Sequence, residues 1–483
     1  MRSSFGKVTL LAATALVALS PAPAFADTLK EALWLAYTDN PTLAAARATQ
    51  RATDEGVTIQ RANGLPSLDA TGQYTEFLKS SSTSFIAPER QLTGSLDLVV
   101  PLYLGGAVRN GIRAADERVE AGRADLRGTE SAIFTQVVAA YMNVILNESL
   151  VQLSANNVDV LGVNLDATSD RFEIGDLTRT DVAQSESRLA LARGDLRTAQ
   201  ANLISARENY IALVGKAPQD LQAPPPLPGL PDSPDAAVDV ALEFNPDLIA
   251  AKQRALAADY DIEVAGAGRL PTLSAYSTGG YQNYLNTLGS ATGTATQEVT
   301  SAQAGFRLSL PIFQGGGVSA RQRQATATAQ AAEERVVAAE RSVIAQVRAA
   351  YSSWRAASEI VESSETAVAA AELSLEGVRA ENSVGNRTIL DILNAQQELL
   401  SAQVQLVTAR RNAYVAGFSL LAAMGQAEAR DLGLEESGPL YDPVTNYRRV
   451  RGIVWDWQRD PDQMATSTST VDIPAPDAEI PAD

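Results

Sequence analysis

The sequence contains neither cysteine nor histidine. Without cysteine the chain can form no disulfide, no thiolate metal site and no lipid-modified N-terminal cysteine. Without histidine it lacks the commonest general base and metal ligand of proteins. No paired carboxylates or activated nucleophile stand out instead, and no Gly-x-x-x-x-Gly-Lys phosphate loop is present. Composition therefore argues against a hydrolase, a redox enzyme or an ATPase, and we expect no cofactor.

Long apolar runs are also absent once the N-terminus is set aside. Residues 1–26 combine the cations Arg2 and Lys7, the apolar run Val8–Leu19 and the small-residue motif Ala24-Phe25-Ala26. This pattern predicts a cleaved signal peptide, with a short membrane anchor as the less favoured alternative. No later stretch of about 18 apolar residues follows, which predicts no transmembrane helix. A periplasmic or extracellular soluble protein and a transmembrane β-barrel both remain possible.

The chain is short of positive charge. Removal of the signal peptide leaves 37 Lys and Arg residues against 57 Asp and Glu residues, a net charge near −20. Because nucleic-acid phosphates are neutralised by Lys and Arg, we expect no nucleic-acid partner.

An internal repeat organises the remaining sequence. Motifs recur first at a spacing of 205 residues and then, after a five-residue insertion, at 210. The paired motifs are Asn40-Pro41 with Asn245-Pro246, Leu65-Pro66 with Leu270-Pro271, Pro101–Gly106 with Pro311–Gly316, Ala140-Tyr141 with Ala350-Tyr351, and Asp181 with Asp391. The predicted organisation is a first repeat at 27–215, a Pro-rich linker at 216–235, a second repeat at 236–425, and a C-terminal segment at 426–483 that ends in a disordered tail.

Each repeat is predicted to begin with one helix, near 28–63 and 235–267, and to continue with two strands and two long helices. The segments 106–173 and 317–382 are nearly free of proline, and a helix of that length spans about 100 Å. The helices that follow carry apolar residues at alternating spacings of three and four, a seam typical of coiled coils. The seam residues are Leu189, Ala192, Leu196, Ala199, Leu203, Ala206, Tyr210 and Leu213, with Leu399, Ala402, Leu406, Ala409, Ala413, Ala416, Leu420 and Ala423 in the second repeat.

The predicted strands alternate apolar and polar residues. Such strands suit a barrel that faces lipid on one side and a wet lumen on the other, or a half-buried sheet on a soluble core. Four strands leave two unpaired edges, which a membrane does not tolerate, and a barrel needs about eight strands or more. Three chains would supply twelve. At the strand–helix junctions, proline ends ladder pairing and glycines permit a sharp change of direction. These predicted swivel residues are Pro101, Gly105, Gly106, Pro311, Gly315 and Gly316.

The chain resembles the TolC family of outer-membrane efflux proteins over residues 28–425. The duplicated Asn-Pro, Leu-Pro and Pro…Gly-Gly motifs carry the resemblance, together with the segments Arg171–Gln184 and Asn382–Gln396. The resemblance implies a mainly α fold with a membrane β-barrel portion. Each chain would contribute four strands and four long helices, and a trimer would form a 12-stranded β-barrel joined to an α-helical barrel. The implied function is a passive exit duct that spans outer membrane and periplasm, with no enzymatic activity.

The resemblance also implies a gate at the two helix-to-helix turns. By position, Asp391 and Asn394 would form the pore constriction, with Asn394 in place of a second aspartate. Thr180, Asp181, Asn382 and Arg387 would latch the gate, and Asn382 stands where the family has a tyrosine. The implied partners are two further copies of the chain, a periplasmic adaptor, an inner-membrane ABC or proton-driven pump, and outer-membrane lipid.

Two readings of function stay open beside the duct. One is a soluble periplasmic coiled-coil adaptor or scaffold, and the other is a carboxylate-based hydrolase, for which no residue set is found. Within the duct reading, type I protein secretion competes with efflux of small toxic compounds. The segment Leu440–Gly452 resembles the C-terminal end of family members associated with secretion.

Overall fold

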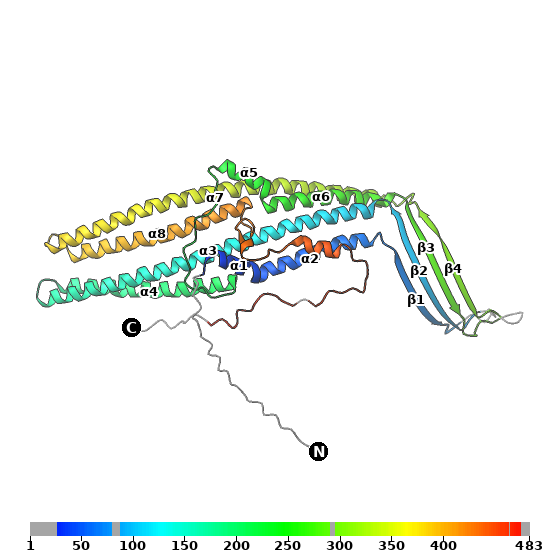
Figure 1. Cartoon of the computed structure of the whole chain (residues 1–483), viewed down its shortest axis with the longest axis horizontal. Helices are drawn as coiled ribbons and strands as arrows, with labels where there is room; N and C mark the ends of the chain where they lie inside the picture. The colour runs from blue at the N-terminus through cyan, green and yellow to red at the C-terminus, as the bar shows by residue number, and fades with distance from the viewer. Residues whose placement is uncertain (1–26, 80–86, 290–294, 463, 475–483) are drawn as a thin grey trace, which may run out of the picture.

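The computed structural model describes residues 27–79, 87–289, 295–462 and 464–474. The molecule is elongated, with a sheet at one end and two long helical hairpins that extend to the other end (Figure 1). The predicted signal peptide, and the last nine residues of the C-terminal segment, lie outside the described residues. None of the helices in the described ranges is both long enough and apolar enough to cross a membrane.

The described elements follow one order twice: two shorter helices, two strands, then two long helices. The first set comprises α1 (Leu29–Asp39), α2 (Pro41–Ala62), β1 (Ser67–Glu76), β2 (Arg90–Leu104), α3 (Ala107–Glu173) and α4 (Arg179–Val214). The second comprises α5 (Pro234–Phe244), α6 (Pro246–Gly266), the 3₁₀ turn η1 (Ala267–Arg269), β3 (Thr272–Asn283), β4 (Glu298–Ser309), α7 (Gly317–Ser383) and α8 (Ile389–Met424). The turn η2 (Leu434–Glu436) and α9 (Pro443–Val450) follow.

The single helix expected at the start of each repeat is wrong, because each Asn-Pro motif divides it in two. Asn40 is extended, with φ −67° and ψ 123°, and Asn245 has nearly the same angles. A residue before proline is driven out of the helical region, and proline at the first helical position suits the start of the next helix. Figure 1 shows the resulting breaks between α1 and α2 and between α5 and α6.

The two asparagines also connect the start of each repeat to the end of its last long helix, α4 in the first repeat and α8 in the second. The Asn40 side-chain oxygen accepts the backbone N–H groups of Thr42 (2.9 Å) and Leu43 (3.3 Å), which caps α2. Its amide group donates to the carbonyl of Leu213 (3.0 Å) in the last turn of α4, where carbonyls have no partner within the helix. Asn245 repeats the arrangement with the carbonyl of Ala423 in α8 (2.9 Å). We name each of these bonded sets an asparagine clasp.

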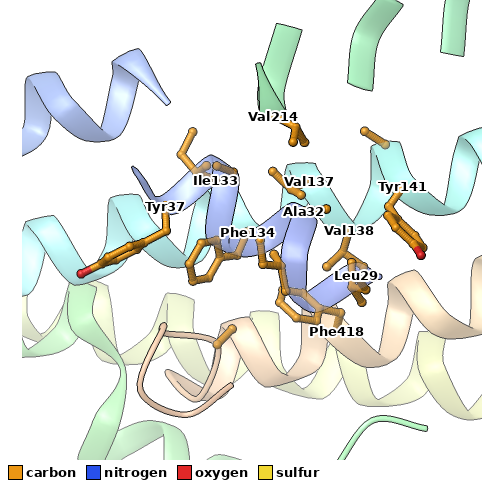
Figure 2. Packing of buried hydrophobic residues seen from close by; sticks show 14 of the residues in the cluster. Leu29, Ala32, Tyr37, Ile133, Phe134, Val137, Val138, Tyr141, Val214 and Phe418 are labelled. Atoms are coloured by element: carbon orange, nitrogen blue, oxygen red, sulfur yellow. The ribbon is translucent and has the colours of Figure 1, made fainter. Parts of the chain in front are cut away.

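The largest apolar core surrounds α1. One face of this helix, at the helical spacings of three and four residues, carries Leu29, Ala32, Leu33, Ala36 and Tyr37, all at least nine-tenths buried. Figure 2 shows Leu29, Ala32 and Tyr37 packed against residues of α3, among them Phe134, with Phe418 of α8 on the same cluster. This core therefore joins both repeats at mid-length of the molecule.

The four strands form one antiparallel sheet in the order β1-β2-β3-β4. Directly paired residues share a face of the sheet. The strand register therefore places the apolar residues on one face of the sheet and the polar residues on the other, as the alternation predicted. The apolar face includes Leu68, Tyr74, Leu92, Leu96, Leu98, Ala275, Tyr281, Phe306 and Leu308. The polar face includes Asp69, Gln73, Thr93, Asp97, Thr278, Gln282, Gln303 and Arg307.

Pro101 does not end its strand, contrary to the sequence prediction. It pairs with Ser274 inside β2, and the register then shifts so that Tyr103 pairs with Leu273. Proline cannot donate to a ladder, and the bulge takes up the interruption while the strand continues to Leu104. The prediction holds in the second repeat, where β4 ends at Ser309 before Pro311.

The C-terminal segment returns to the first repeat. Asp54 of α2 is fully buried, and its two carboxylate oxygens accept from the amides of Gln50 (3.0 Å) and Asn446 (2.8 Å). The Tyr447 hydroxyl, also on α9, donates to Asp116 of α3 (2.7 Å). Helix α9 thus supplies the second hydrogen-bond partner of Asp54, whose first partner, Gln50, lies on α2 itself.

A partly buried carboxylate lies where the chain leaves α8. Glu130 of α3 accepts the backbone N–H of Ala429 (2.6 Å), next to an ion pair between Arg127 and Glu428 (2.6 Å). Burial raises the pKa of Glu130 from 4.5 to about 7, and the charge of Glu428 adds to this, while the Ala429 N–H opposes it. The carboxylate also faces Arg47, which lowers its pKa, and Asp431, which raises it.

We predict that Glu130→Gln removes a pH dependence of stability. A group whose pKa is raised by folding stabilises the fold fully below its unfolded pKa, and this contribution is lost as pH rises through the folded pKa. Between pH 4.5 and about 7 the wild-type chain should therefore lose roughly 3 kcal/mol relative to the glutamine variant. Urea unfolding of the detergent-solubilised protein, followed by circular dichroism at pH 5 and pH 8, measures the difference.

Asp125→Asn is the matched control. Asp125 lies on the same helix but is exposed and paired with the exposed Arg254. Its variant should keep the wild-type pH slope, and a Glu130→Gln variant that also keeps it would contradict the prediction.

Candidate functional site: the turns that end the helical hairpins

Two short turns connect the long helices at the end of the molecule remote from the sheet (Figure 1). The turn after α3 contains Gly175 at φ 82°, and the turn after α7 contains Gly385 at φ 83°. These left-handed angles favour glycine. In each turn the residue after the glycine donates its N–H to the carbonyl of the residue five positions earlier, Asp176 to Arg171 and Asn386 to Glu381. The two turns therefore share one backbone design.

Each turn is followed by a capping box. Asp391 accepts the backbone N–H of Thr388 (2.9 Å) and its hydroxyl (2.8 Å), while the Thr388 hydroxyl receives the Asp391 N–H (3.3 Å). Thr178 and Asp181 form the same reciprocal pair at the start of α4. Sequence reasoning singled out both aspartates but missed the threonines. The Thr-x-x-Asp spacing was the available signal, because it is a capping-box pattern.

The caps keep both aspartates ionised. The Thr388 N–H and hydroxyl, which donate to the carboxylate, hold the pKa of Asp391 below its usual value. The Thr178 hydroxyl and N–H do the same for the pKa of Asp181. Only Oδ2 of Asp391 is used in these bonds. The charged oxygen Oδ1 forms no hydrogen bond with any other residue in the described part of the chain, so it can face a neighbouring group or an ion.

The predicted latch residues do not meet within one chain. Arg387 pairs with Glu381 in its own turn (2.7 Å), and the Asn382 amide donates to the Arg387 carbonyl (2.7 Å). Within the described ranges, no hydrogen bond or ion pair connects Asn382 or Arg387 with Thr180 or Asp181. All four lie at the remote ends of the hairpins, with Thr180 and Arg387 exposed.

The two hairpins are tied together by other residues, a short distance behind the turns. Arg188 of α4 donates to the side-chain oxygen of Asn394 in α8 (3.2 Å). Asn164 of α3 donates to Gln396 (2.8 Å). No sequence motif indicates these pairs, whose members are 206 and 232 positions apart. A small apolar cluster lies between the two hairpins and contains Leu161, Leu189, Ala192 and Leu393. Asn394, predicted at the constriction, thus also contacts the other hairpin.

The predicted swivel glycines occupy the joint between sheet and long helices. Gly105, Gly106, Gly315 and Gly316 all have positive φ, between 58° and 85°. A Cβ on Gly105 would lie 2.8 Å from the carbonyl oxygen of Ala267, so only glycine fits there. Gly315 meets no such neighbour, and its requirement is conformational alone. Gly105 is therefore packed against η1, whereas the space around Gly315 is open.

Comparison with known proteins agrees with this geometry. The sequence profile of the family described as "Outer membrane efflux protein" matches residues 33–216 and 237–426. The outer membrane efflux protein BepC of Brucella suis is 32% identical over 441 residues, which cover 91% of this chain and 93% of BepC. The outer membrane protein TolC of Vibrio cholerae is 26% identical, with 88% and 96% covered.

A solved structure shows the same fold. The outer membrane channel CmeC of Campylobacter jejuni superposes with a TM-score of 0.72 at 16% identity, over 88% of this chain and 89% of that one. The repeated strand-and-hairpin architecture, the two halves matched by the family profile, and the identity to BepC along nearly the whole chain lead to one conclusion. The chain belongs to the outer membrane efflux protein family, in agreement with its resemblance to TolC, and its place is the outer membrane.

Proposed function

We propose that three copies of this chain form a passive exit duct from the periplasm through the outer membrane. The observation that carries the proposal is the sheet, which has an apolar face, a polar face and two edge strands, β1 and β4, whose outer edges pair with no other strand of the described residues. In hydrocarbon such edges need partners. Pairing β1 of one copy with β4 of the next closes a barrel, with the polar faces inward.

The long hairpins extend this barrel as a helical tube. Helices α3 and α7 contain 67 residues each, which corresponds to about 100 Å. The tube therefore places the capped turns deep in the periplasm, where a periplasmic adaptor and an inner-membrane pump would dock. The duct itself catalyses nothing, and the energy for export comes from the pump. The family assignment favours this function over a soluble adaptor or scaffold.

A deletion strain tests the exported substrate. Because the relative BepC is named an efflux protein, we expect deletion to raise sensitivity to small toxic compounds by several doubling dilutions, measured as minimal inhibitory concentrations. The secreted proteins of the same strain are compared with those of the parent by mass spectrometry. Selective loss of one or a few large proteins would establish type I secretion instead.

Complementation with the intact gene is the control and should restore the parental behaviour. If neither drug sensitivity nor the secreted proteins change, and the protein is present in the parent's outer membrane, the exit-duct proposal is contradicted.

We further propose that Asp391 supplies the charge of the pore constriction. Its free oxygen and its lowered pKa leave a carboxylate that three copies would bring to a common axis, where it attracts cations. Asn394 lies three residues further along α8 and provides a ring of uncharged amides, whose oxygens accept hydrogen bonds from Arg188. The constriction would then rest on one acidic ring.

We predict that Asp391→Asn weakens cation selectivity and block by divalent cations in planar bilayers. The asparagine keeps the size of the side chain and its capping oxygen but loses the charge. Asp195→Asn is the control, because it removes one negative charge from an exposed position on α4 that belongs to neither the constriction nor the latch. If both variants change the block equally, or neither does, charge at Asp391 is not its cause.

The latch is proposed to act between neighbouring copies. Arg387 is held by Glu381 in its own turn, yet both are about half exposed. In a closed duct Arg387 could exchange this partner for Thr180 and Asp181 of the adjacent copy, while Asn382 keeps the turn rigid through its bond to the Arg387 carbonyl. The four residues would then hold neighbouring hairpins together at their tips.

Arg387→Ala should therefore open the duct. We expect a larger single-channel conductance than wild type and entry of large antibiotics that intact cells exclude. Glu381→Gln provides the contrast, because it frees Arg387 from its own turn and should leave the conductance at or below the wild-type value. A conductance that rises in Glu381→Gln but not in Arg387→Ala would show that the pair within the turn, rather than a latch between copies, keeps the duct closed.

A further inference from the structure

A groove of about 860 Å³ lies at the first strand–helix joint, and the sequence analysis assigned it no role. The end of β2, the start of α3 and the end of α6 line it. Its volume is in the range of sites that hold organic ligands. Leu102 and Tyr103 form one wall, and both are about half exposed, at 52% and 47%.

The apolar wall continues the apolar face of the sheet. Tyr103 pairs with Leu273, which pairs with Leu308, so these residues lie on the face that carries Leu98 and Phe306. Leu102 is the extra residue of the bulge and stands beside them. The groove is therefore the point at which the apolar face of the sheet ends.

Two arginines line the other part of the groove. Arg109 and Arg113 are both exposed and one helical turn apart on α3, so their side chains project from the same face. Neither forms an ion pair with a carboxylate in the described ranges of the chain. Arg113 lies over the ring of Tyr260, 5.8 Å from its centre. Glu263 is the one carboxylate in the lining, which leaves the groove a net positive charge.

With the sheet in the outer membrane, the arginines lie near the depth of lipid phosphates. They are two and six residues beyond Ala107, the first residue of α3, which places them about 3 and 9 Å past the start of that helix along its axis. The polar headgroup layer on each side of a bilayer is about 5–8 Å thick. A guanidinium donates paired hydrogen bonds to phosphate oxygens, and cations near a membrane surface attract anionic lipid.

We propose that this groove is a binding site for one glycerophospholipid per chain. The phosphate lies between Arg109 and Arg113, and one acyl chain lies along Leu102 and Tyr103. Gly105 has no side chain and its backbone packs directly against η1, so backbone atoms form the base of the groove at the joint. The inference rests on the membrane location of the sheet and is independent of what the duct exports.

The second repeat differs at the corresponding joint, which provides a matched control. At the spacing of 210 residues Arg113 corresponds to Arg323, but Arg109 corresponds to Ser319, and β4 ends before the joint instead of continuing into it. Two exposed arginines, Arg321 and Arg323, lie near the start of α7 outside this groove. Substitution of these two changes the net charge by the same amount at a comparable position.

The test uses the full-length protein, purified as its assembled channel in detergent and titrated with phosphatidylglycerol. Native mass spectrometry counts the bound lipids. We expect one retained lipid per chain in the wild type, and a dissociation constant raised roughly 10- to 30-fold in the double variant R109Q/R113Q. R321Q/R323Q should bind as the wild type does, and circular dichroism with gel migration of the assembled form checks that each variant folds.

Two further arms keep the result interpretable. The single variant Arg109→Gln should show part of the loss if the double variant does not assemble. Leu102→Ser should weaken binding of the lipid but not of water-soluble glycerophosphoglycerol. Equal loss in both double variants would show general attraction between charges and overturn the proposal, as would unchanged binding in R109Q/R113Q. Competition by glycerophosphoglycerol at concentrations equal to those of the lipid would show a bare phosphate site and exclude the lipid.

Discussion

The unpaired backbone groups along β1 and β4 are the constraint on which the rest of the molecule depends. Each strand has one neighbour in the sheet, so half of its N–H and C=O groups point outward. In water such an edge is a liability, and in hydrocarbon it is excluded unless another strand pairs with it. The need for edge pairing dictates assembly of several chains. It also aligns the long hairpins of neighbouring copies, because each hairpin leaves the sheet through a short joint.

Glycine, asparagine and proline at a few positions determine how the helices and strands join. Glycine at the strand–helix joints permits positive φ, and Asn-Pro both ends one helix and begins another. These motifs could be recognised in the sequence because they occur twice. The sequence did not show that Asn40 also contacts Leu213, since that bond depends on a tertiary contact across 173 positions. Pro101 was misjudged for a similar reason: whether a proline ends a strand depends on whether a bulge can accommodate it.

The remote turns show the same division between local and distant information. Glycine, threonine and aspartate at fixed spacing are local signals, and the Thr388–Asp391 cap could have been read from them. The bond between Arg188 and Asn394 could not, because neither residue type nor spacing distinguishes it from any exposed pair. Glu130 is a third case. Its raised pKa arises from burial against a segment 299 positions later in the chain. No pattern around residue 130 reports that burial.

The bond between Asp54 and Asn446 has a consequence for how the chain matures. Each asparagine clasp joins residues of one repeat, so the first repeat can close on itself before the second has been translocated. Asp54 is different, because its carboxylate is fully buried and its second partner arrives 392 positions later. A buried charge short of a partner is destabilising. A chain without α9 should therefore hold α2 less firmly, because Gln50 is then the remaining side-chain partner of the Asp54 carboxylate. The attachment of α2 is thus completed only after α9 has been made.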